Sequence, residues 1–293
     1  MSDRGNAADS SVALSIGQCA TLACLLEAAI PKPGNVHRGA DFHDLTFYDF
    51  AAAAVAVGPV FERARQSDGV GRTVLDAVGA TRRLTGTNVN LGIVLLLAPL
   101  ARVKRAVPLP TGVAGVLQAL TPEDAARTYE AIRLAEPGGL GTSDEADLAG
   151  PAPVDLLAAM RLAADRDLVA RQYVDDFAEV FEVVGDIVAQ RSAGRRLADA
   201  VIRAHLRLMH EHPDALIARK CGAAVAREAA AYAGQVLAAG EPGEETYHEA
   251  LADFDFWLRS DGHRRNPGTT ADLIAAALFV LLRDNMISDP LRV

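Results

Sequence analysis

The sequence is short of aromatic residues and cysteines, and it has no apolar segment long enough to cross a membrane. Aromatic residues make up 5% of the 293 residues, and 3 residues are cysteines. An odd number of cysteines in apolar stretches argues against a disulfide framework and predicts buried thiols in a reducing cytoplasm. The longest apolar run, 91–101, contains Pro99 and falls well short of the roughly 20 residues that a bilayer requires. We therefore expect a soluble, cytoplasmic protein without a membrane partner.

Positive charge is also scarce. The chain carries 29 Lys and Arg residues against 38 Asp and Glu residues, a formal net charge of −9. Nucleic-acid binding depends on clustered cations that contact phosphates, so a nucleic-acid partner is not expected. A small phosphorylated ligand is still compatible with this composition, because a local positive pocket or a helix N-terminus is enough to bind it.

Alternation of apolar and polar residues, which indicates half-buried strands, is absent over any useful length. The chain is rich instead in alanine, leucine and valine, and these favour helices because ordering Ala and Leu there costs little side-chain entropy. We predict an all-α fold in which residues 12–293 form a single multi-helix globular domain, with a polar ligand pocket made by interhelical loops. Residues 1–11 are polar, lack a signal-peptide pattern and are expected to form a disordered tail.

Several helix boundaries can be predicted from capping residues. Thr46 followed by Asp49 forms a capping-box pattern, and Thr269 with Asp272 repeats it. Asp214 is expected to cap a long helix that continues to about residue 238. Two further segments are assigned from composition: a helix at 173–191 and a surface loop at 138–153.

The first of three candidate functional loops covers residues 31–44. Prolines on both sides of Lys32 restrict its backbone, and Gly34 permits a turn or a close approach to a ligand. The residues expected to bind a phosphate chain are Lys32, Gly34, Asn35, His37 and Arg38. Asp41 and Asp44 are candidate ligands of Mg²⁺, which binds one or two carboxylates together with phosphate oxygens. The alternative is an ordinary solvated loop.

The second loop joins two predicted helices at residues 85–92. Thr87, Asn88 and Asn90 lie at the start of the following helix, where free backbone amides suit an anion or a sugar hydroxyl. The alternative is that Thr87 or Asn88 only caps this helix.

The third loop covers residues 266–273. Asn266, Gly268, Thr269 and Thr270 offer backbone amides and hydroxyls that could cradle a phosphate. Asp272 is a candidate metal ligand, and a capping box explains it equally well.

Charged residues on the predicted helices give a weaker signal. Arg219 is a further candidate for ATP binding, and a surface ion pair is the alternative. Three histidines near a helix end, His205, His210 and His212, are expected to be solvated.

Stretches around the three loops occur in the same order in one known family. Residues 31–34 read Pro-Lys-Pro-Gly, residues 85–88 read Thr-Gly-Thr-Asn, and residues 266–273 read Asn-Pro-Gly-Thr-Thr-Ala-Asp-Leu. They resemble the Ser-Pro-Lys-Pro-Gly, Thr-Gly-Gly-Val-Asn-Thr-His-Lys-Gly and Ser-Pro-Gly-Gly-Ser-Ala-Asp-Leu segments of the triphosphoribosyl-dephospho-CoA synthase family. Segments around 165–167 and 214–219 fall in corresponding order, so the resemblance covers nearly the whole chain.

The resemblance implies an all-α transferase that uses ATP as a substrate. In that family the ribose hydroxyl of 3′-dephospho-CoA attacks C1 of the ATP ribose, and adenine leaves. Lys32 is then expected to clamp the triphosphate, with Mg²⁺ bound by carboxylates such as Asp41, Asp44 or Asp272. Either one of these carboxylates or His43 is expected to act as the base. A homodimer is allowed for as the assembly state.

The chain departs from the family pattern inside the expected pocket. Asn90-Leu91 stands where the family has His-Lys, and Thr269-Thr270 where it has Gly-Ser. A related cofactor precursor is therefore an alternative acceptor. Three other functions stay open: an ATP-dependent ribosyl or phosphoryl transferase of another cofactor pathway, a metal-dependent helical phosphohydrolase suggested by the His43-Asp44 dipeptide, and a non-catalytic helical binding protein.

Overall fold

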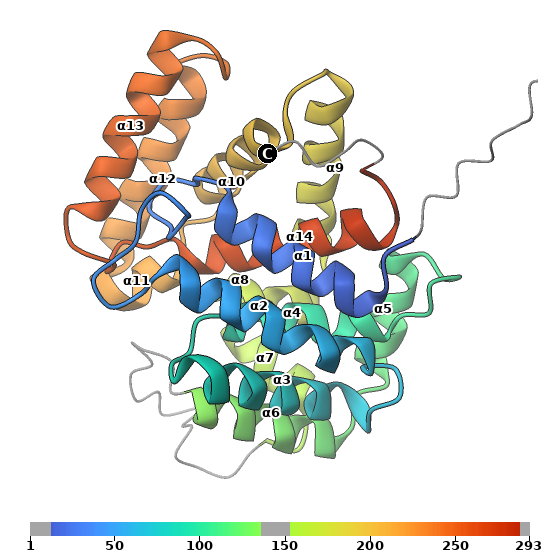
Figure 1. The fold of residues 1–293 in the computed structure, drawn as a ribbon. Coiled ribbons are helices and arrows are strands. Elements are labelled where there is room, and N and C mark those ends of the chain that lie inside the picture. The colour runs from blue at the N-terminus through green and yellow to red at the C-terminus, as the bar shows by residue number, and fades with distance from the viewer. Residues whose placement is uncertain (1–12, 136–152, 288–293) are drawn as a thin grey trace, which may run out of the picture.

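Helices are the only extended regular elements in the computed structural model, which describes residues 13–135 and 153–287 (Figure 1). Two isolated β-bridges, both in the loop at 31–46, accompany them in the described residues. The predicted all-α, single-domain fold is confirmed, and its buried apolar side chains form one contiguous core. The expected tail at 1–11 and nearly all of the expected surface loop at 138–153 lie outside the described residues. None of the described helices is both long and apolar enough to span a membrane.

The described residues form fourteen helices. The first seven are α1 (Ile16–Ala29), α2 (Phe47–Glu62), α3 (Gly69–Thr85), α4 (Leu91–Arg102), α5 (Leu109–Gln118), α6 (Pro122–Ala135) and α7 (Leu156–Ala163). The others are α8 (Leu168–Val174), α9 (Ala178–Ser192), α10 (Leu197–Glu211), α11 (Ala215–Cys221), α12 (Ala223–Ala238), α13 (Glu245–Arg259) and α14 (Gly268–Arg283).

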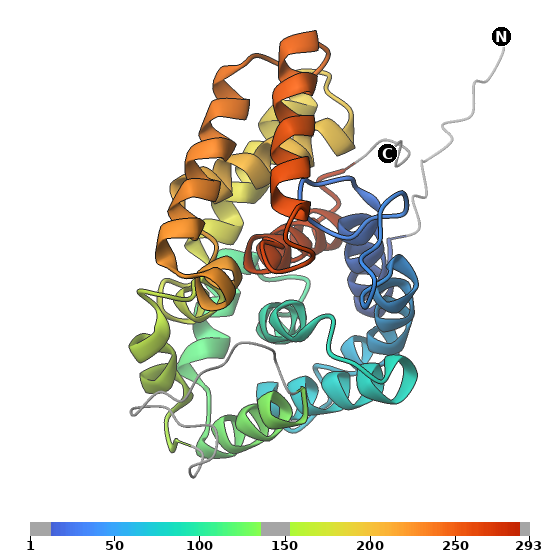
Figure 2. The ribbon, with the colours of Figure 1, turned by 90° about the vertical axis from the view of Figure 1, so that its left-hand side faces the viewer.

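Helix α14 is the centre of the fold. Every residue from Thr269 to Arg283 is buried with the exception of Asp272. A helix that is apolar on all sides has to be surrounded by others, and α14 packs against α1, α4 and α9. Figure 2 looks almost along α14 and shows the other helices arranged around it. Within this buried stretch, Asp272 therefore marks a gap in the packing.

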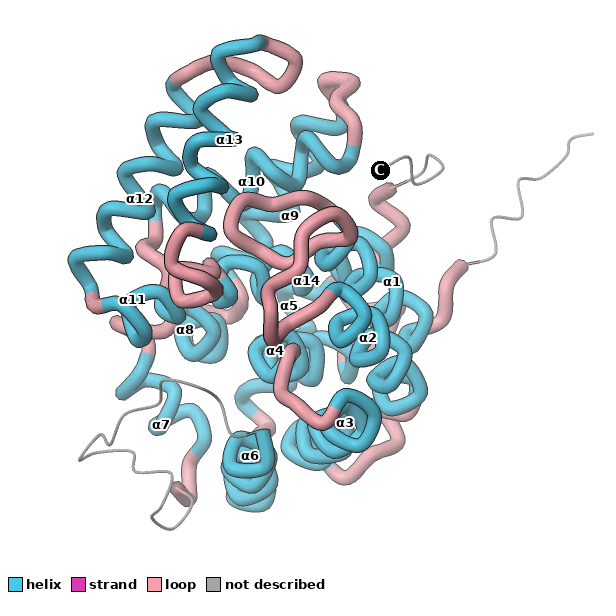
Figure 3. The backbone as a smooth tube through the Cα atoms, turned by 60° about the vertical axis from the view of Figure 1, so that its left-hand side comes forward, coloured by secondary structure: helices cyan, strands magenta, loops and turns pink. Residues whose placement is uncertain are grey.

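Two groups of helices flank α14. Helices α1, α2, α3 and α6 pack in sequence along one flank, and α10, α12 and α13 pack on another. The α12–α13 pair projects from the body in Figure 2. The loops that connect α1 to α2, α3 to α4 and α13 to α14 lie on the side turned to the viewer in Figure 3. These are the three loops that the sequence singled out.

The capping prediction at Thr46 is confirmed, and the one at Thr269 is wrong. Asp49 Oδ2 accepts hydrogen bonds from the Thr46 amide (2.9 Å) and hydroxyl (2.8 Å), which completes the capping box of α2. Thr269 instead lies inside the first turn of α14, because that helix already begins at Gly268. Asp272 therefore does not form the capping box that its spacing predicted.

Two predicted helices are each broken in two. Asp214 caps α11 as expected, but Gly222 (φ 92°) separates α11 from α12. The helix predicted at 173–191 is interrupted by Asp176 (φ 50°) and Phe177 (φ 67°), which are left-handed. Phe177 gives no signal of such a conformation, since bulky residues adopt it rarely, and Asp176 gives only a weak one. Composition also gave no indication of α5.

His205 is buried rather than solvated, because it lies on the face of α10 that packs toward α14. Neither ring nitrogen has a hydrogen-bond partner. Burial, together with the charge of Lys32, holds the pKa of His205 well below its usual value. The imidazole is therefore neutral.

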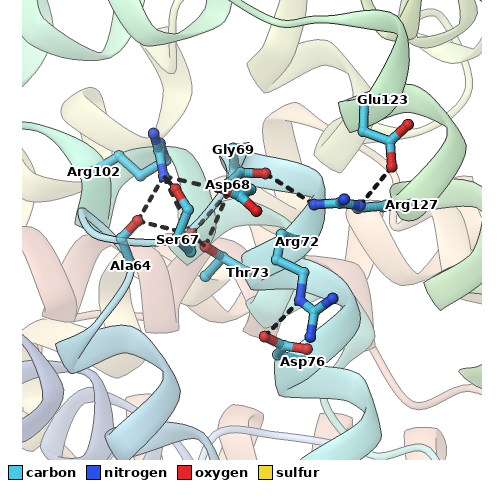
Figure 4. Close-up of polar contacts among 10 residues, drawn as sticks. All are labelled: Ala64, Ser67, Asp68, Gly69, Arg72, Thr73, Asp76, Arg102, Glu123 and Arg127. Atoms are coloured by element: carbon cyan, nitrogen blue, oxygen red, sulfur yellow. Dashed lines mark hydrogen bonds and ion pairs between the residues drawn. The ribbon is translucent and has the colours of Figure 1, made fainter.

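Arg102 joins the end of α4 to the turn between α2 and α3 (Figure 4). Its Nη1 donates to the carbonyl oxygens of Ala64 (2.6 Å), Ser67 (3.1 Å) and Gly69 (3.3 Å) and to the Ser67 hydroxyl (3.2 Å). A guanidinium suits this role because it offers several donors in a fixed geometry. The turn is thereby held by one side chain.

Candidate functional site

One cleft of about 970 Å³ opens where the three loops meet. Its walls come from these loops, from α11, and from parts of α1, α4, α6, α7 and α14. Small-molecule sites typically measure about 300–1,000 Å³. The cleft is therefore at the upper end of the range, as a site for two substrates requires.

The structure brings ten of the predicted site residues to this cleft and leaves seven outside its walls. Those that line it are Asn35, Asp44, Thr87, Asn88, Asn90, Arg219, Asn266, Gly268, Thr269 and Asp272. Those that do not are Lys32, Gly34, His37, Arg38, Asp41, His43 and Thr270.

The first loop is held against the third by several polar contacts. Asn35 Nδ2 donates to Asn266 Oδ1 (2.6 Å), and Asp44 Oδ1 lies 2.9 Å from His263 Nδ1. Gly34 adopts φ 75°, donates its amide to Asp255 Oδ1 (2.7 Å), and leaves no room for a Cβ beside α13. Glycine is needed here for both its left-handed conformation and its small size. The loop is thus a docked wall of the cleft.

The second loop places amide groups at the start of α4. Asn88 Oδ1 accepts a hydrogen bond from the Leu91 amide (3.1 Å), so this side chain caps the helix. Asn90 lines the cleft and is almost fully buried, and its Nδ2 has no hydrogen-bond partner among the described residues. A buried donor without a partner costs free energy, which a ligand acceptor would recover.

The third loop is organised by a buried carboxylate. Asp214 Oδ2 accepts from the amide and the hydroxyl of Thr270, both at 2.8 Å. Its Oδ1 accepts from the Leu216 and Ile217 amides at the start of α11. Thr270 therefore serves the packing of α11 against α14, whereas Thr269 and Gly268 face the cleft.

Three basic side chains, Arg166, Arg219 and Lys220, and one histidine, His263, reach the cleft from α11 and from the loops that precede α8 and α14, and Arg82 of α3 also lines it. Arg219 is already paired, since its Nη1 lies 2.8 Å from Asp167 Oδ2. His263 is paired with Asp44. Lys220 and Arg166 also line the cleft, and neither side chain makes a hydrogen bond or ion pair with a described residue. Burial lowers the pKa of Lys220, and Asp44 opposes that effect.

Lys32 does not reach the cleft, because its ammonium group folds back onto the end of α1. The side chain is 0% exposed and lies 2.8 Å from Glu27 Oε1. It also donates to the carbonyl oxygens of Glu27 and Ile30. Three acceptors use all three donors of an ammonium group, so the predicted clamp on the triphosphate does not fit this placement. Glu27, its partner, lines the cleft instead.

Asp272 is the most perturbed carboxyl group of the cleft. Burial, together with the charges of Glu27, Asp214 and Asp167, raises the pKa of Asp272 well above its usual value. Its carboxyl group makes no hydrogen bond or ion pair with the described residues. The carboxyl group of Asp272 fills the space beside Gly92 of α4, so a Cβ added to Gly92 would lie 2.0 Å from Asp272 Oδ2. Strongly perturbed groups in clefts are typical of functional sites.

The chain is similar over nearly its whole length to one family of nucleotide-using enzymes. Residues 13–289 match the family model of ATP:dephospho-CoA triphosphoribosyl transferase. This chain belongs to the ATP:dephospho-CoA triphosphoribosyl transferase family. It is thus a transferase, and ATP is its substrate.

A solved structure supports the same relationship. The crystal structure of a protein from Archaeoglobus fulgidus, assigned as a triphosphoribosyl-dephospho-CoA synthase, superposes with a TM-score of 0.61 at 25% sequence identity. The match covers 80% of this chain and 98% of that chain. No curated protein matches the chain. The family resemblance inferred from the three loops is therefore confirmed.

Four residues of this transferase cleft were not predicted from the sequence. Glu27 and Lys220 were overlooked because nothing local distinguishes them from helix-surface charges, and His263 because it lies outside the matched motifs. Arg166 lies in the matched segment at 165–167, but a surface ion pair explained its charge equally well. For Glu27 one signal was present: it is the only charged residue of α1. A single charge in an otherwise uncharged helix is seldom left without a role.

The predicted Mg²⁺ ligands do not form a preassembled site. Asp44 and Asp272 line the transferase cleft and Asp41 does not, since its Oδ1 accepts from the Phe47 amide (2.6 Å). Within residues 13–135 and 153–287, no group of three or more His, Cys, Asp or Glu side chains is placed to hold a metal ion. Mg²⁺ that arrives on a triphosphate needs only one or two carboxylates, so its binding stays a prediction.

Proposed function

We propose that this cleft transfers the triphosphoribosyl group of ATP to a ribose hydroxyl of 3′-dephospho-CoA, or of a related cofactor precursor, with release of adenine. The observation that carries the proposal is the convergence of three family-like loops on a cleft with two cations, Lys220 and Arg166, whose side chains make no hydrogen bond or ion pair with a described residue. The size of the cleft supports two substrates.

Lys220 and Arg166 are the proposed partners of the triphosphate. A phosphate chain supplies the negative charge with which these two cations can pair, and charge-assisted hydrogen bonds to phosphate are strong. Arg219 contributes less, because Asp167 already holds it. Asn266 and Thr269 lie on the same wall and add neutral donors. This assignment replaces Lys32 as the clamp.

One part of the cleft lining is apolar. Tyr129 and Ile132 of α6 and Met160 of α7 line it. Apolar walls with a few polar groups are typical of sites that hold rings and alkyl chains. We assign this wall to the adenine ring of ATP or to the pantetheine arm of the acceptor.

The reaction is a displacement at C1 of the ribose. The acceptor oxygen forms a bond to C1, the bond from C1 to the adenine nitrogen breaks, and adenine leaves with the bonding electrons. The hydroxyl loses one proton and adenine takes up one, so the protons balance. A transition state of this type carries positive charge on the sugar, which nearby carboxylates stabilise.

Mg²⁺, when bound, would neutralise charge on the triphosphate. Asp44 and Asp272 are the proposed ligands, since both line the cleft and Asp272 makes no hydrogen bond or ion pair with the part of the chain that the structure describes. Asp41 and His43, which were also predicted for metal binding or catalysis, lie outside the cleft walls. The expected homodimer and cytoplasmic location stay predictions.

Release of adenine tests the proposal directly. The protein is incubated with ATP, Mg²⁺ and dephospho-CoA, and adenine and the coupled product are measured by chromatography and mass spectrometry. Adenine that forms only when the acceptor is present supports triphosphoribosyl transfer. ADP or AMP in its place would contradict the proposal and indicate phosphoryl chemistry.

Binding measurements test the phosphate site. Lys220→Met and Arg166→Met are each expected to weaken ATP binding at least about tenfold, or about 1.4 kcal/mol, in isothermal titration calorimetry. Arg72→Met is the matched control, because Arg72 pairs with Asp76 on the exposed face of α3 (Figure 4). Unchanged ATP affinity in both cleft variants would rule out these residues as the triphosphate site.

A metal-dependent phosphohydrolase receives no comparable support. His43, half of the dipeptide that suggested it, is exposed and outside the cleft. Asp44, the other half, is bound to His263.

A further inference from the structure

A buried ion pair lies directly beneath the cleft. Lys32 and Glu27 are 0% and 4% exposed at their side chains, and their charged atoms are 2.8 Å apart. Removing two charges from water costs free energy that their attraction rarely exceeds, and a well-packed apolar pair is often as stable or more stable. The fold alone therefore does not require this pair.

The pair is asymmetric in what it presents to the cleft. Lys32 directs its donors to Glu27 and to the carbonyl oxygens of Glu27 and Ile30, so it is committed to the protein. Glu27 is held at Oε1, while no hydrogen bond of the described residues engages Oε2. Because Glu27 lines the cleft, this second oxygen is available to a ligand.

No other anion among the described residues contacts Lys32. His205 is the buried titratable neighbour on α10, and it is neutral. The charge on the ammonium is therefore balanced by Glu27, whose Oε1 lies 2.8 Å from the Lys32 nitrogen.

The other carboxyl groups of the cleft are less suited to accept a proton. Both oxygens of Asp167 are used, one by Arg219 and one by the α8 amides. Asp44 is bound to His263 and 59% exposed at its side chain. Asp272 has a pKa raised by burial, which favours its protonated form. Glu27 alone combines burial, a fixed counter-ion and an unengaged oxygen.

We propose that Glu27 is the general base of the reaction and that Lys32 is a positioning residue that orients it. The assignment rests on the proposed triphosphoribosyl transfer. As the acceptor oxygen bonds to C1 of the ATP ribose, its proton passes to Glu27 Oε2, while the bond between C1 and adenine breaks and adenine leaves with the electron pair. One proton passes from the hydroxyl to Glu27, and adenine takes up one proton, so the protons balance and no further reactant is needed.

The closing experiment measures acceptor-dependent adenine release and ATP affinity in the same preparations. In Glu27→Gln, kcat is expected to fall by about 10²–10⁴-fold, the usual contribution of a general base, with ATP affinity within threefold of the parent. Glu123→Gln, an exposed carboxylate on α6, is the control and is expected to match the parent. A Glu27→Gln enzyme with kcat within threefold of the parent overturns the assignment.

A rescue experiment separates a catalytic role from a structural one. Added formate is expected to restore part of the activity of Glu27→Ala, because it can occupy the vacated carboxylate position. No rescue, together with a lowered melting temperature, would indicate that Glu27 only supports the fold and would overturn the proposal.

Lys32 is tested by separating kcat from binding. Lys32→Met is expected to lower kcat and to leave ATP affinity within threefold, whereas a triphosphate clamp would lose at least tenfold in affinity. If Lys32→Met does not fold, the double variant Glu27→Met/Lys32→Met removes both charges and is expected to fold, bind ATP and lack activity. An active double variant would overturn the proposal. A parent protein that releases no adenine would instead refute the proposed function and this assignment with it.

Discussion

The contact between Gly92 and Asp272 leads to the sharpest prediction. Gly92 lies in the first turn of α4, and the carboxyl group of Asp272 occupies the space where a side chain would begin. In Gly92→Ala, the new Cβ would lie 2.0 Å from Oδ2 and 2.5 Å from Cγ of Asp272. The carboxyl group has to move, because real Cβ atoms essentially never approach other atoms to less than 3.0 Å.

The size of the effect follows from this geometry. Ordinary contact begins at 3.4 Å, so Oδ2 has to shift by about 1.4 Å from its 2.0 Å position. A misplacement of about 1 Å at a reacting centre can cost about 10²-fold in rate. Stability changes less: alanine gains about 1 kcal/mol over glycine in a helix, and overpacking costs about 1–3 kcal/mol. We expect a net loss of at most about 2 kcal/mol with a fall of about 10²-fold in adenine release.

The assay pairs kcat for adenine release with urea unfolding of the same variant. Gly115→Ala and Gly185→Ala are matched controls, because a Cβ at either position meets nothing within 4 Å. Both lie inside helices and are expected to gain up to about 1 kcal/mol in unfolding free energy with unchanged activity. Full activity in Gly92→Ala would refute the functional importance of the Asp272 position.

Three further variants test other parts of the structure. Gly34→Ala is expected to lose about 2–5 kcal/mol in denaturant unfolding, because alanine is strained at φ 75° and its Cβ would lie 2.7 Å from Leu258 and 2.9 Å from Pro267. Asp272→Asn is expected to become more stable relative to the parent as pH rises above 3.8. Because the pKa of Asp272 is raised in the folded parent, the folded parent retains a proton that the unfolded chain releases, and the stability of the parent falls with rising pH. The amide of the variant cannot ionise, so the variant does not lose stability in this way. A constant difference in unfolding free energy between about pH 4 and about pH 8 would contradict this reasoning. Arg102→Lys is expected to lose about 1–3 kcal/mol, because a point charge cannot replace one guanidinium nitrogen shared among three carbonyl oxygens; an unchanged denaturation midpoint would disprove it.

The same two carboxyl groups, Glu27 and Asp272, connect these predictions to the chemistry. Both line the cleft: Glu27 lies beside the buried Lys32, and Asp272 has no hydrogen-bond or ion-pair partner within residues 13–135 and 153–287. Pairs of carboxyl groups in different environments can take different protonation states at the same pH. The variants at Gly92, Glu27 and Asp272 are therefore three independent tests of the same site.

The sequence by itself was sufficient for the fold class, the loops and the family. An abundance of Ala and Leu without strand periodicity predicts helices, and local motifs such as the Thr46–Asp49 capping box act over three residues. The loop motifs are likewise continuous in the chain, which is why they could be recognised without a structure. These features depend on neighbours along the backbone.

Only the tertiary structure decided which side chains face the cleft. Lys32 lies between two prolines in the best-matched loop, yet its ammonium folds back to Glu27, five residues earlier. Arg166 and Lys220 come from segments more than fifty residues apart and meet at one cleft through the packing of α8 and α11 against α14. Local sequence can mark a residue as chemically capable, but the orientation of a side chain depends on long-range packing, and that packing placed Glu27 rather than Lys32 in the site.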